Sequence, residues 1–242
     1  MTDCDAKACY DRIVPIVLYL SYSKVGLPHT ACVWLCKSLT KMQYHMTTAQ
    51  GVSERYTENS SDCQIYGVGQ VDTDAPTGWL FVSTKTSRLQ DKHATGCVMR
   101  DPTRTITVCW THVIFVDDTY LMHTLEDPKA KETEIAKVVE QDVNLWNKGI
   151  ETTGGRLEGT KTKFYTLLWK FKSTGETYLE NKDDSDLNVK IISEGKPTQL
   201  KQIRNDTEPN KFKSLGTMVP GIFSDHYELE AAKTKYACSR SF

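Results

Sequence analysis

The chain has 242 residues, of which 39% are hydrophobic and 25% charged, and its formal net charge is −1. This composition supports a buried core and excludes global disorder. The balanced charge gives no overall basic signature for nucleic acid, so any contact with nucleic acid requires a local positive surface.

The sequence carries no pattern of a secreted or membrane-spanning protein. The eight cysteines are scattered without a Cys-x-x-Cys pair. Cys32 and Cys36 lie one helical turn apart but have no Cys/His partner pair, which favours free thiols in a reducing compartment. The longest apolar run, residues 13–20, contains Pro15 and is too short to cross a bilayer. With no signal peptide, we expect an intracellular protein, cytoplasmic or nuclear, that is not secreted and has no membrane partner.

The first part of the chain predicts helices and a hairpin. The predicted helices cover residues 12–24, 28–41 and 74–89, and the predicted hairpin strands cover residues 43–48 and 53–58. Gly26 is a plausible C-terminal stop for the first helix, and Pro28 suits the first turn of the second. Asp74 is a good N-cap for the third helix, which has an apolar face.

The most informative feature is the pair Asp117-Asp118 between two apolar stretches. Residues 113–116 predict one strand and residues 119–122 its return partner. Two adjacent carboxylates at a hairpin tip repel each other, and a divalent cation is the usual remedy because Mg²⁺ and Mn²⁺ prefer oxygen ligands. For the dipeptide alone, a solvated Asp-Asp turn is the better interpretation.

The second part of the chain changes character after one more helix. Residues 131–150 place apolar side chains at helical spacing and predict an amphipathic helix. Short strands and a last helix then follow, at residues 163–171, 177–179, 188–192, 200–203 and, for the helix, 227–236. We therefore expect a domain over residues 1–172 and a smaller β-rich extension over residues 173–242 that ends in a helix.

Five motifs follow one another in a particular order along the chain. They are the acidic segment around Asp5, the loop Tyr66-Gly67-Val68-Gly69-Gln70 with its helix, the Asp117-Asp118 hairpin, the amphipathic helix, and Gly154-Gly155 followed by Lys161. In this order the chain resembles the palm domain of reverse transcriptases, particularly of retroelements and group II introns, over roughly residues 5–169. The resemblance implies an α+β fold, with a polymerase palm-like antiparallel sheet backed by helices and a smaller β-rich C-terminal part.

The resemblance also implies roles for individual residues. Asp5, Asp117 and Asp118 would be catalytic and would bind Mg²⁺ or Mn²⁺, as template-directed DNA synthesis by two-metal nucleotidyl transfer requires. Lys161 would be catalytic, because it matches a lysine that neutralises or protonates the leaving pyrophosphate. The implied partners are an RNA or DNA template with its primer, and deoxynucleoside triphosphates.

Three further residues match substrate-binding positions of the same family. Tyr10 lies five residues after Asp5, where an aromatic ring excludes the ribose 2′-hydroxyl, although an ordinary core tyrosine is the alternative. Gln70 matches the glutamine that contacts the incoming nucleotide. Gly69 lets the backbone approach the site closely.

Two departures from the family keep other functions open. The sequence before Asp5 has no room for a fingers region, and Val71 stands where the family usually has a glycine. We therefore expect a fragment or degenerate copy of a retroelement polymerase, and leave its enzymatic activity open. The alternatives are a catalytically inactive palm relic that acts as a nucleic-acid or protein interaction module, and an unrelated α/β protein with a chance Asp-Asp turn.

Overall fold

The computed structural model describes most of the chain but not all of it. The described residues are 1–7, 10–58, 67, 75–101, 103–115, 118–125, 127, 130–166, 169–179, 187–193, 195–203, 212–214 and 217–219. Gly69, Gln70, Asp117 and the helix expected at residues 227–236 lie outside these ranges.

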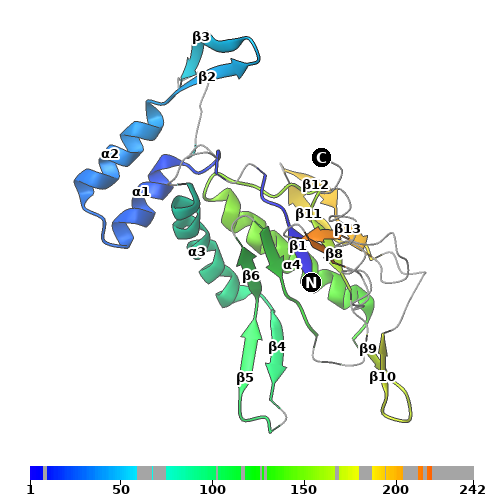
Figure 1. The fold of residues 1–242 in the computed structure, drawn as a ribbon. Coiled ribbons are helices and arrows are strands. Elements are labelled where there is room, and N and C mark those ends of the chain that lie inside the picture. Colours follow the sequence, from blue (N-terminus) through cyan, green and yellow to red (C-terminus); the bar gives the residue numbers. More distant parts are fainter. Residues whose placement is uncertain are drawn as a thin grey trace, which may run out of the picture.

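The described residues form an α+β structure (Figure 1). Its helices are α1 (Pro15–Lys24), α2 (His29–Thr40), α3 (Ala75–His93) and α4 (Glu132–Glu151). Its strands are β1 (Thr2–Cys4), β2 (Gln43–Thr48), β3 (Gly51–Glu58), β4 (Cys97–Arg100), β5 (Thr107–Trp110), β6 (His112–Phe115), β7 (Asp118–Leu121), β8 (Lys163–Tyr165), β9 (Trp169–Phe171), β10 (Thr177–Leu179), β11 (Lys190–Ser193), β12 (Lys196–Gln199), β13 (Lys201–Ile203), β14 (Phe212–Ser214) and β15 (Thr217–Val219).

The central sheet has five strands in the order β13-β8-β1-β7-β6. Its first strand in the sequence, β1, is the middle strand in space and pairs antiparallel with both β7 and β8. The edge strand β6 pairs antiparallel with β7, and β13 at the opposite edge runs parallel to β8. Because β13 follows residue 172, the predicted C-terminal extension contributes a strand to this sheet.

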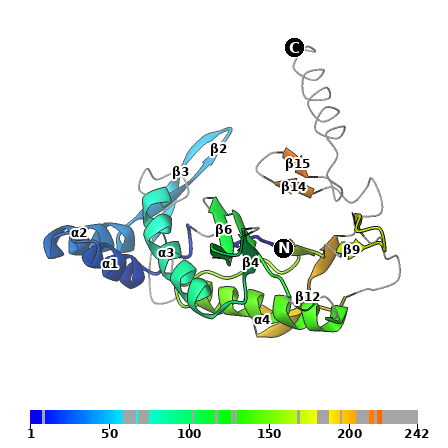
Figure 2. The ribbon, with the colours of Figure 1, turned by 90° about the horizontal axis from the view of Figure 1, so that it is seen from below.

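Helices α3 and α4 pack against each other, and α4 crosses beneath the sheet (Figure 2). Successive side chains of a strand point to opposite faces, so one face of each strand meets these helices. The core beneath the sheet includes Leu121 of β7, Phe164 of β8, and Val143 and Trp146 of α4, all of them buried. The opposite face of the strands carries no helix among the described residues (Figure 2).

Helix α4 follows directly from its sequence pattern. Its buried apolar residues are spaced three or four apart, which is the repeat of one helix face: Ala136, Val139, Val143, Trp146 and Ile150. At its start, the Glu134 carboxylate accepts a hydrogen bond from the Lys131 backbone N–H at 3.0 Å. The amphipathic helix predicted from the sequence is confirmed within one residue at each end.

The predicted N-terminal helices and hairpin are also present. Helices α1 and α2 pack against each other at one side of the sheet. The β2–β3 hairpin projects beyond them, away from the sheet (Figure 1). Proline at the start of α1 fits because its missing N–H has no intrahelical partner there. The β4–β5 hairpin likewise projects beyond the sheet (Figure 1).

Several short strands differ from the sequence predictions. The structure contains β1, β4, β12, β14 and β15, which were not predicted, and it divides the predicted strand at residues 163–171 into β8 and β9. These strands have three or four residues each. So few residues give too short a period-two pattern to define a strand without its pairing partner.

Candidate carboxylate site

The first strand places two aspartates on the helix-free face of the sheet. Thr2 and Cys4 are buried, and Asp3 between them is partly exposed, as the alternation of a strand requires. Asp5 follows immediately and continues the same alternation, with 37% of its side chain exposed. Asp5 was predicted as a site residue and Asp3 was not, although the pattern Thr2-Asp3-Cys4-Asp5 already contains this period of two.

Asp118 begins the neighbouring strand β7 and lies on the same face. In β7, Asp118 and Tyr120 are partly exposed, whereas the residues between and after them are buried. The register pairs Asp3 with Tyr120 and Cys4 with Thr119. Continuing it by one residue sets Asp5 opposite Asp118, and directly opposed residues of antiparallel strands have Cα atoms about 4.5–5.5 Å apart.

The carboxylates of this face influence one another electrostatically. Burial raises the pKa of Asp3 from 3.8 to about 6, with a further rise from the Asp118 charge, an opposing effect of Lys163 and a smaller rise from Asp5. Burial, followed by Asp3 and Asp118, raises the pKa of Tyr120 to about 12. We call Asp3, Asp5 and Asp118 the carboxylate site, because each contributes negative charge to this face.

Lys161 lies beside the carboxylate site. Its Nζ atom is 3.5 Å from Oδ2 of Asp5, in an ion pair whose lysine side chain is 71% exposed. The contact arises because residues 156–158 run alongside residues 5–7. The Glu158 N–H donates to the Asp5 carbonyl oxygen at 2.8 Å, and the Lys7 N–H donates to the Arg156 carbonyl oxygen at 2.9 Å. Asp5 and Lys161, which the sequence analysis named together, are therefore neighbours.

The other substrate-binding candidates are described only in part. Tyr10 is buried, and its ring meets Trp79 of α3 edge-on with centroids 6.4 Å apart. Gly67 adopts φ +102° against the backbone of Tyr10 and Asp11, where a Cβ atom would collide. The glycine-containing loop thus packs on the acidic segment at this one described position.

Within the described part of the chain, no three His, Cys, Asp or Glu side chains gather as a metal-binding group. Asp117, the second metal ligand expected from the sequence, is outside that part. In the same ranges, no helix combines the length and the apolar character needed to cross a membrane.

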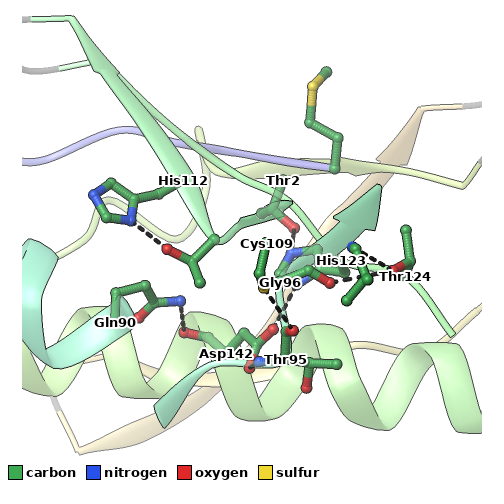
Figure 3. A network of polar contacts seen from close by, with 12 residues as sticks. Thr2, Gln90, Thr95, Gly96, Cys109, His112, His123, Thr124 and Asp142 are labelled. Carbon is green, nitrogen blue, oxygen red and sulfur yellow. Dashed lines mark hydrogen bonds and ion pairs between the residues drawn. The ribbon is translucent and has the colours of Figure 1, made fainter. Parts of the chain in front are cut away.

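The opposite, helix-covered face contains a buried polar network that the sequence analysis missed (Figure 3). Nδ1 of His123 is 2.8 Å from Oδ2 of Asp142, and Nε2 is 3.0 Å from Oγ1 of Thr2. The other oxygen of Asp142, Oδ1, accepts a hydrogen bond from Thr95 N–H at 3.2 Å, and its backbone carbonyl accepts one from Gln90 at 3.3 Å. No sequence motif connects these residues, because their separations along the chain have no regular spacing.

Comparisons with known proteins leave the family undetermined. No protein-family model matches the sequence, and no curated protein matches it significantly.

Proposed function

We propose that this chain is a nucleotidyl-transfer palm related to reverse transcriptases, with a metal-dependent site formed by Asp5, Asp118 and the adjacent Asp117. The observation that carries the proposal is the arrangement of β1 and β7. These neighbouring antiparallel strands bring Asp5 and Asp118 to one end of the helix-free face, over a sheet backed by α3 and α4.

The donor set fits Mg²⁺ or Mn²⁺. Hard divalent cations prefer carboxylate oxygens, and the proposed ligands Asp5, Asp117 and Asp118 are all carboxylates. When bound, such an ion would supply Lewis-acid polarisation of a phosphoryl oxygen or a primer hydroxyl. The pKa of Asp3 is raised first by burial and then by the charge of Asp118, so a cation at this face would offset part of that repulsion.

The chain's own residues would bind the substrate's charges from two sides. Lys161 is mostly exposed and lies 3.5 Å from Asp5, so its ammonium group can reach an anionic phosphate next to the carboxylates. Lys163 faces Asp3 across β1 and β8. An RNA or DNA template-primer and a deoxynucleoside triphosphate are the substrates that this combination of acidic and basic groups would accept.

A second candidate function is a catalytically inactive palm that serves as an interaction module. One side of the β4–β5 hairpin favours it: the pairs Cys97–Trp110 and Met99–Val108 share a face, and Met99, Val108 and Trp110 are exposed. Burial of Tyr10 against Trp79 also suits a structural tyrosine better than one that contacts a sugar.

Manganese binding tests the proposed site directly. The water-proton relaxation of Mn²⁺ is titrated with the chain and with Asp117→Asn, Asp5→Asn and the control Asp11→Asn. Asp11 is an exposed aspartate of the same N-terminal segment and lies outside the site. We expect weak binding, because two or three carboxylates leave most coordination positions to water.

The two site variants should weaken Mn²⁺ binding about tenfold or more, and Asp11→Asn should not. Equal Mn²⁺ binding by the wild type and all three variants would show that Asp5 and Asp117 are not metal ligands. Primer extension on an oligo(dT)-primed RNA template then separates the two candidate functions. Metal binding without extension favours the interaction module, and Asp117-dependent extension favours the polymerase.

A further inference from the structure

The polar network beneath the sheet connects the strands of the carboxylate site to helix α4. Thr2 belongs to β1, His123 follows β7 by two residues, and Asp142 lies in the middle of α4. All three side chains are buried or nearly so: Thr2 is 0% exposed, and the side chains of His123 and Asp142 are 2% and 4% exposed. Figure 3 shows His123 between Thr2 and Asp142.

The donor and acceptor roles along this chain follow from chemistry. A carboxylate accepts hydrogen bonds, so His123 donates through Nδ1–H to Asp142. Its Nε2 is then free of a proton and accepts a hydrogen bond from the Thr2 hydroxyl. A single neutral imidazole therefore links β1 to α4. Because His123 follows β7 by two residues, it also connects β7, the strand of Asp118, to α4.

We propose that His123 is a positioning residue of the carboxylate site, which in its neutral form holds β1 and β7 on α4 so that Asp5 and Asp118 stay aligned. This inference rests on the proposed function, because the alignment of Asp5 and Asp118 matters only if these aspartates bind a metal ion. His123 itself touches neither aspartate, and it lies on the other side of the sheet.

Protonation of His123 would work against this arrangement. Burial lowers the pKa of His123 below its ordinary 6.5, while the hydrogen bond with Asp142 raises it and the Met1 amino group lowers it. Asp142 of α4 and the Met1 amino group, just before β1, face the imidazole. Burial lowers the pKa of the Met1 amino group from 8.0 to about 6, so this group titrates near the same pH. Burial outweighs the hydrogen bond with Asp142, so the folded site favours the neutral ring, and the cation is favoured by states in which the site has opened to water.

Three variants separate positioning from general packing. His123→Ala removes both hydrogen bonds. His123→Gln keeps one N–H donor and one oxygen acceptor at a similar spacing but cannot be protonated. Thr124→Val is the matched control, because it deletes the hydroxyl of the neighbouring residue. That hydroxyl donates to the Gly96 carbonyl and accepts from the Val98 N–H, at the start of β4, and has no hydrogen bond to β1 among those described.

The first measurement needs no metal. Amide hydrogen exchange is followed in β1 and β7, with the distant β2–β3 hairpin as an internal reference. We expect His123→Ala to accelerate exchange in β1 and β7 about tenfold, because buried polar groups lose their partners. His123→Gln should restore most of the protection, and Thr124→Val should leave β1 unchanged. Should His123→Ala fail to fold, Thr2→Val carries the same comparison with one hydrogen bond removed.

The second measurement is Mn²⁺ affinity as a function of pH. Both the wild-type protein and His123→Gln contain the same carboxylates, so the difference between their profiles belongs to His123. Below pH 6.5 the wild type should lose affinity more steeply, by about threefold relative to His123→Gln, because protonated His123 favours the open network. A purely structural residue would give parallel profiles.

The possible outcomes distinguish this inference from the proposed function. Unchanged exchange in β1 and β7 of His123→Ala would overturn the positioning role, and so would parallel pH profiles. Faster exchange that leaves Mn²⁺ affinity intact would also overturn it. A wild-type protein that binds no Mn²⁺ would instead overturn the proposed metal site, and the exchange data alone would then decide whether His123 holds the strands.

Discussion

The helix-free face of the central sheet and the face that packs on α3 and α4 treat their polar groups differently. Beneath the sheet, Thr2, His123 and Asp142 satisfy one another in a closed chain of hydrogen bonds. On the other face, Asp3 and Tyr120 lie opposite each other with their pKa values raised to about 6 and about 12. One face thus links buried polar groups by hydrogen bonds, and the other brings acidic groups together on a partly exposed surface.

This difference indicates how the two faces divide stability and chemistry. Buried apolar side chains and satisfied hydrogen bonds contribute most of the free energy of folding. Groups with perturbed pKa values gather at functional sites more often than elsewhere. Substitutions on the helix-covered face should therefore change stability, and substitutions on the carboxylate face should change binding or even increase stability.

The largest expected effect compares two phenylalanines of the same sheet. Phe164 of β8 is fully buried against the helices, whereas Phe115 of β6 is 57% exposed. Phe164→Ala should lower the free energy of unfolding by about 4 kcal/mol, because it deletes a ring from a packed core. Phe115→Ala should change it by less than about 0.5 kcal/mol. Urea denaturation followed by circular dichroism measures both values.

The reverse ranking of these two variants would contradict the assignment of the faces. A large loss in Phe115→Ala would indicate that the helix-free face is covered in solution. The slope of each urea transition serves as the control, because an unchanged slope shows that stability, and not the extent of unfolding, has altered.

A smaller effect on the free energy of unfolding is expected from substitution of Asp3, and its size depends on pH. The pKa of Asp3 is higher in the folded protein, about 6, than the ordinary 3.8, so the folded state holds the proton more tightly. The stabilisation is fully present below pH 3.8 and is lost as the pH rises through about 6. Asp3→Asn should therefore increase stability at pH 7 by about 1 kcal/mol, once solvent screening is allowed for.

Thermal unfolding of Asp3→Asn and the wild type at pH 3.5 and pH 7 tests this prediction. The two proteins should unfold at similar temperatures at the lower pH and separate at the higher one. A wild type that is more stable than Asp3→Asn at pH 7 would show that Asp3 makes a favourable ionic contact, and that the carboxylates do not repel one another.

The smallest effect on stability is expected from the exposed ion pair of Lys161 with Asp5. Lys161→Gln should change the free energy of unfolding by less than about 0.5 kcal/mol, as is usual for exposed pairs. It should nevertheless raise Mn²⁺ affinity about threefold, because the ammonium group no longer competes for Asp5. Titration calorimetry and urea denaturation measure the two quantities.

The matched control is Lys7→Gln, which removes the neighbouring ion pair of Lys7 with Glu158, 3.3 Å long and also partly exposed. Lys7→Gln should leave Mn²⁺ affinity unchanged. If both lysine variants raise affinity equally, the effect comes from the overall charge of the surface, and the specific contact with Asp5 has no separate role.

Local patterns predicted the helices of the described residues well, because each of these helices has its own sequence signals. Apolar spacing defined α4, and proline or glycine marked the ends of α1 and α2. The β2–β3 hairpin followed from two strands around a glycine-containing turn. These features depend on residues within about twenty positions of one another, the range over which periodicity and capping act.

The sheet and the site were harder to predict. The three-residue strand β1 has no periodic signal of its own and gains its identity only from β7 and β8. The order of motifs predicted catalytic roles for Asp5 and Lys161, but it predicted neither their ion pair nor a place for Asp3. The link from Thr2 through His123 to Asp142 spans 121 and 19 residues, and such long-range hydrogen bonds leave no pattern in a single sequence.

The central position of β1 has a consequence for biosynthesis. Thr2 finds its partners at Leu121 and Phe164, so the middle of the sheet cannot assemble until the ribosome has released residue 164. At ordinary elongation rates this delay is on the order of ten seconds, and β1 has neither neighbour until β7 has been synthesised. Helices α1 and α2 can form early, but the sheet must close late around β1, the first of its strands along the sequence. Slow codons or chaperone binding between residues 121 and 164 should therefore influence the yield of native protein more than similar pauses near α2.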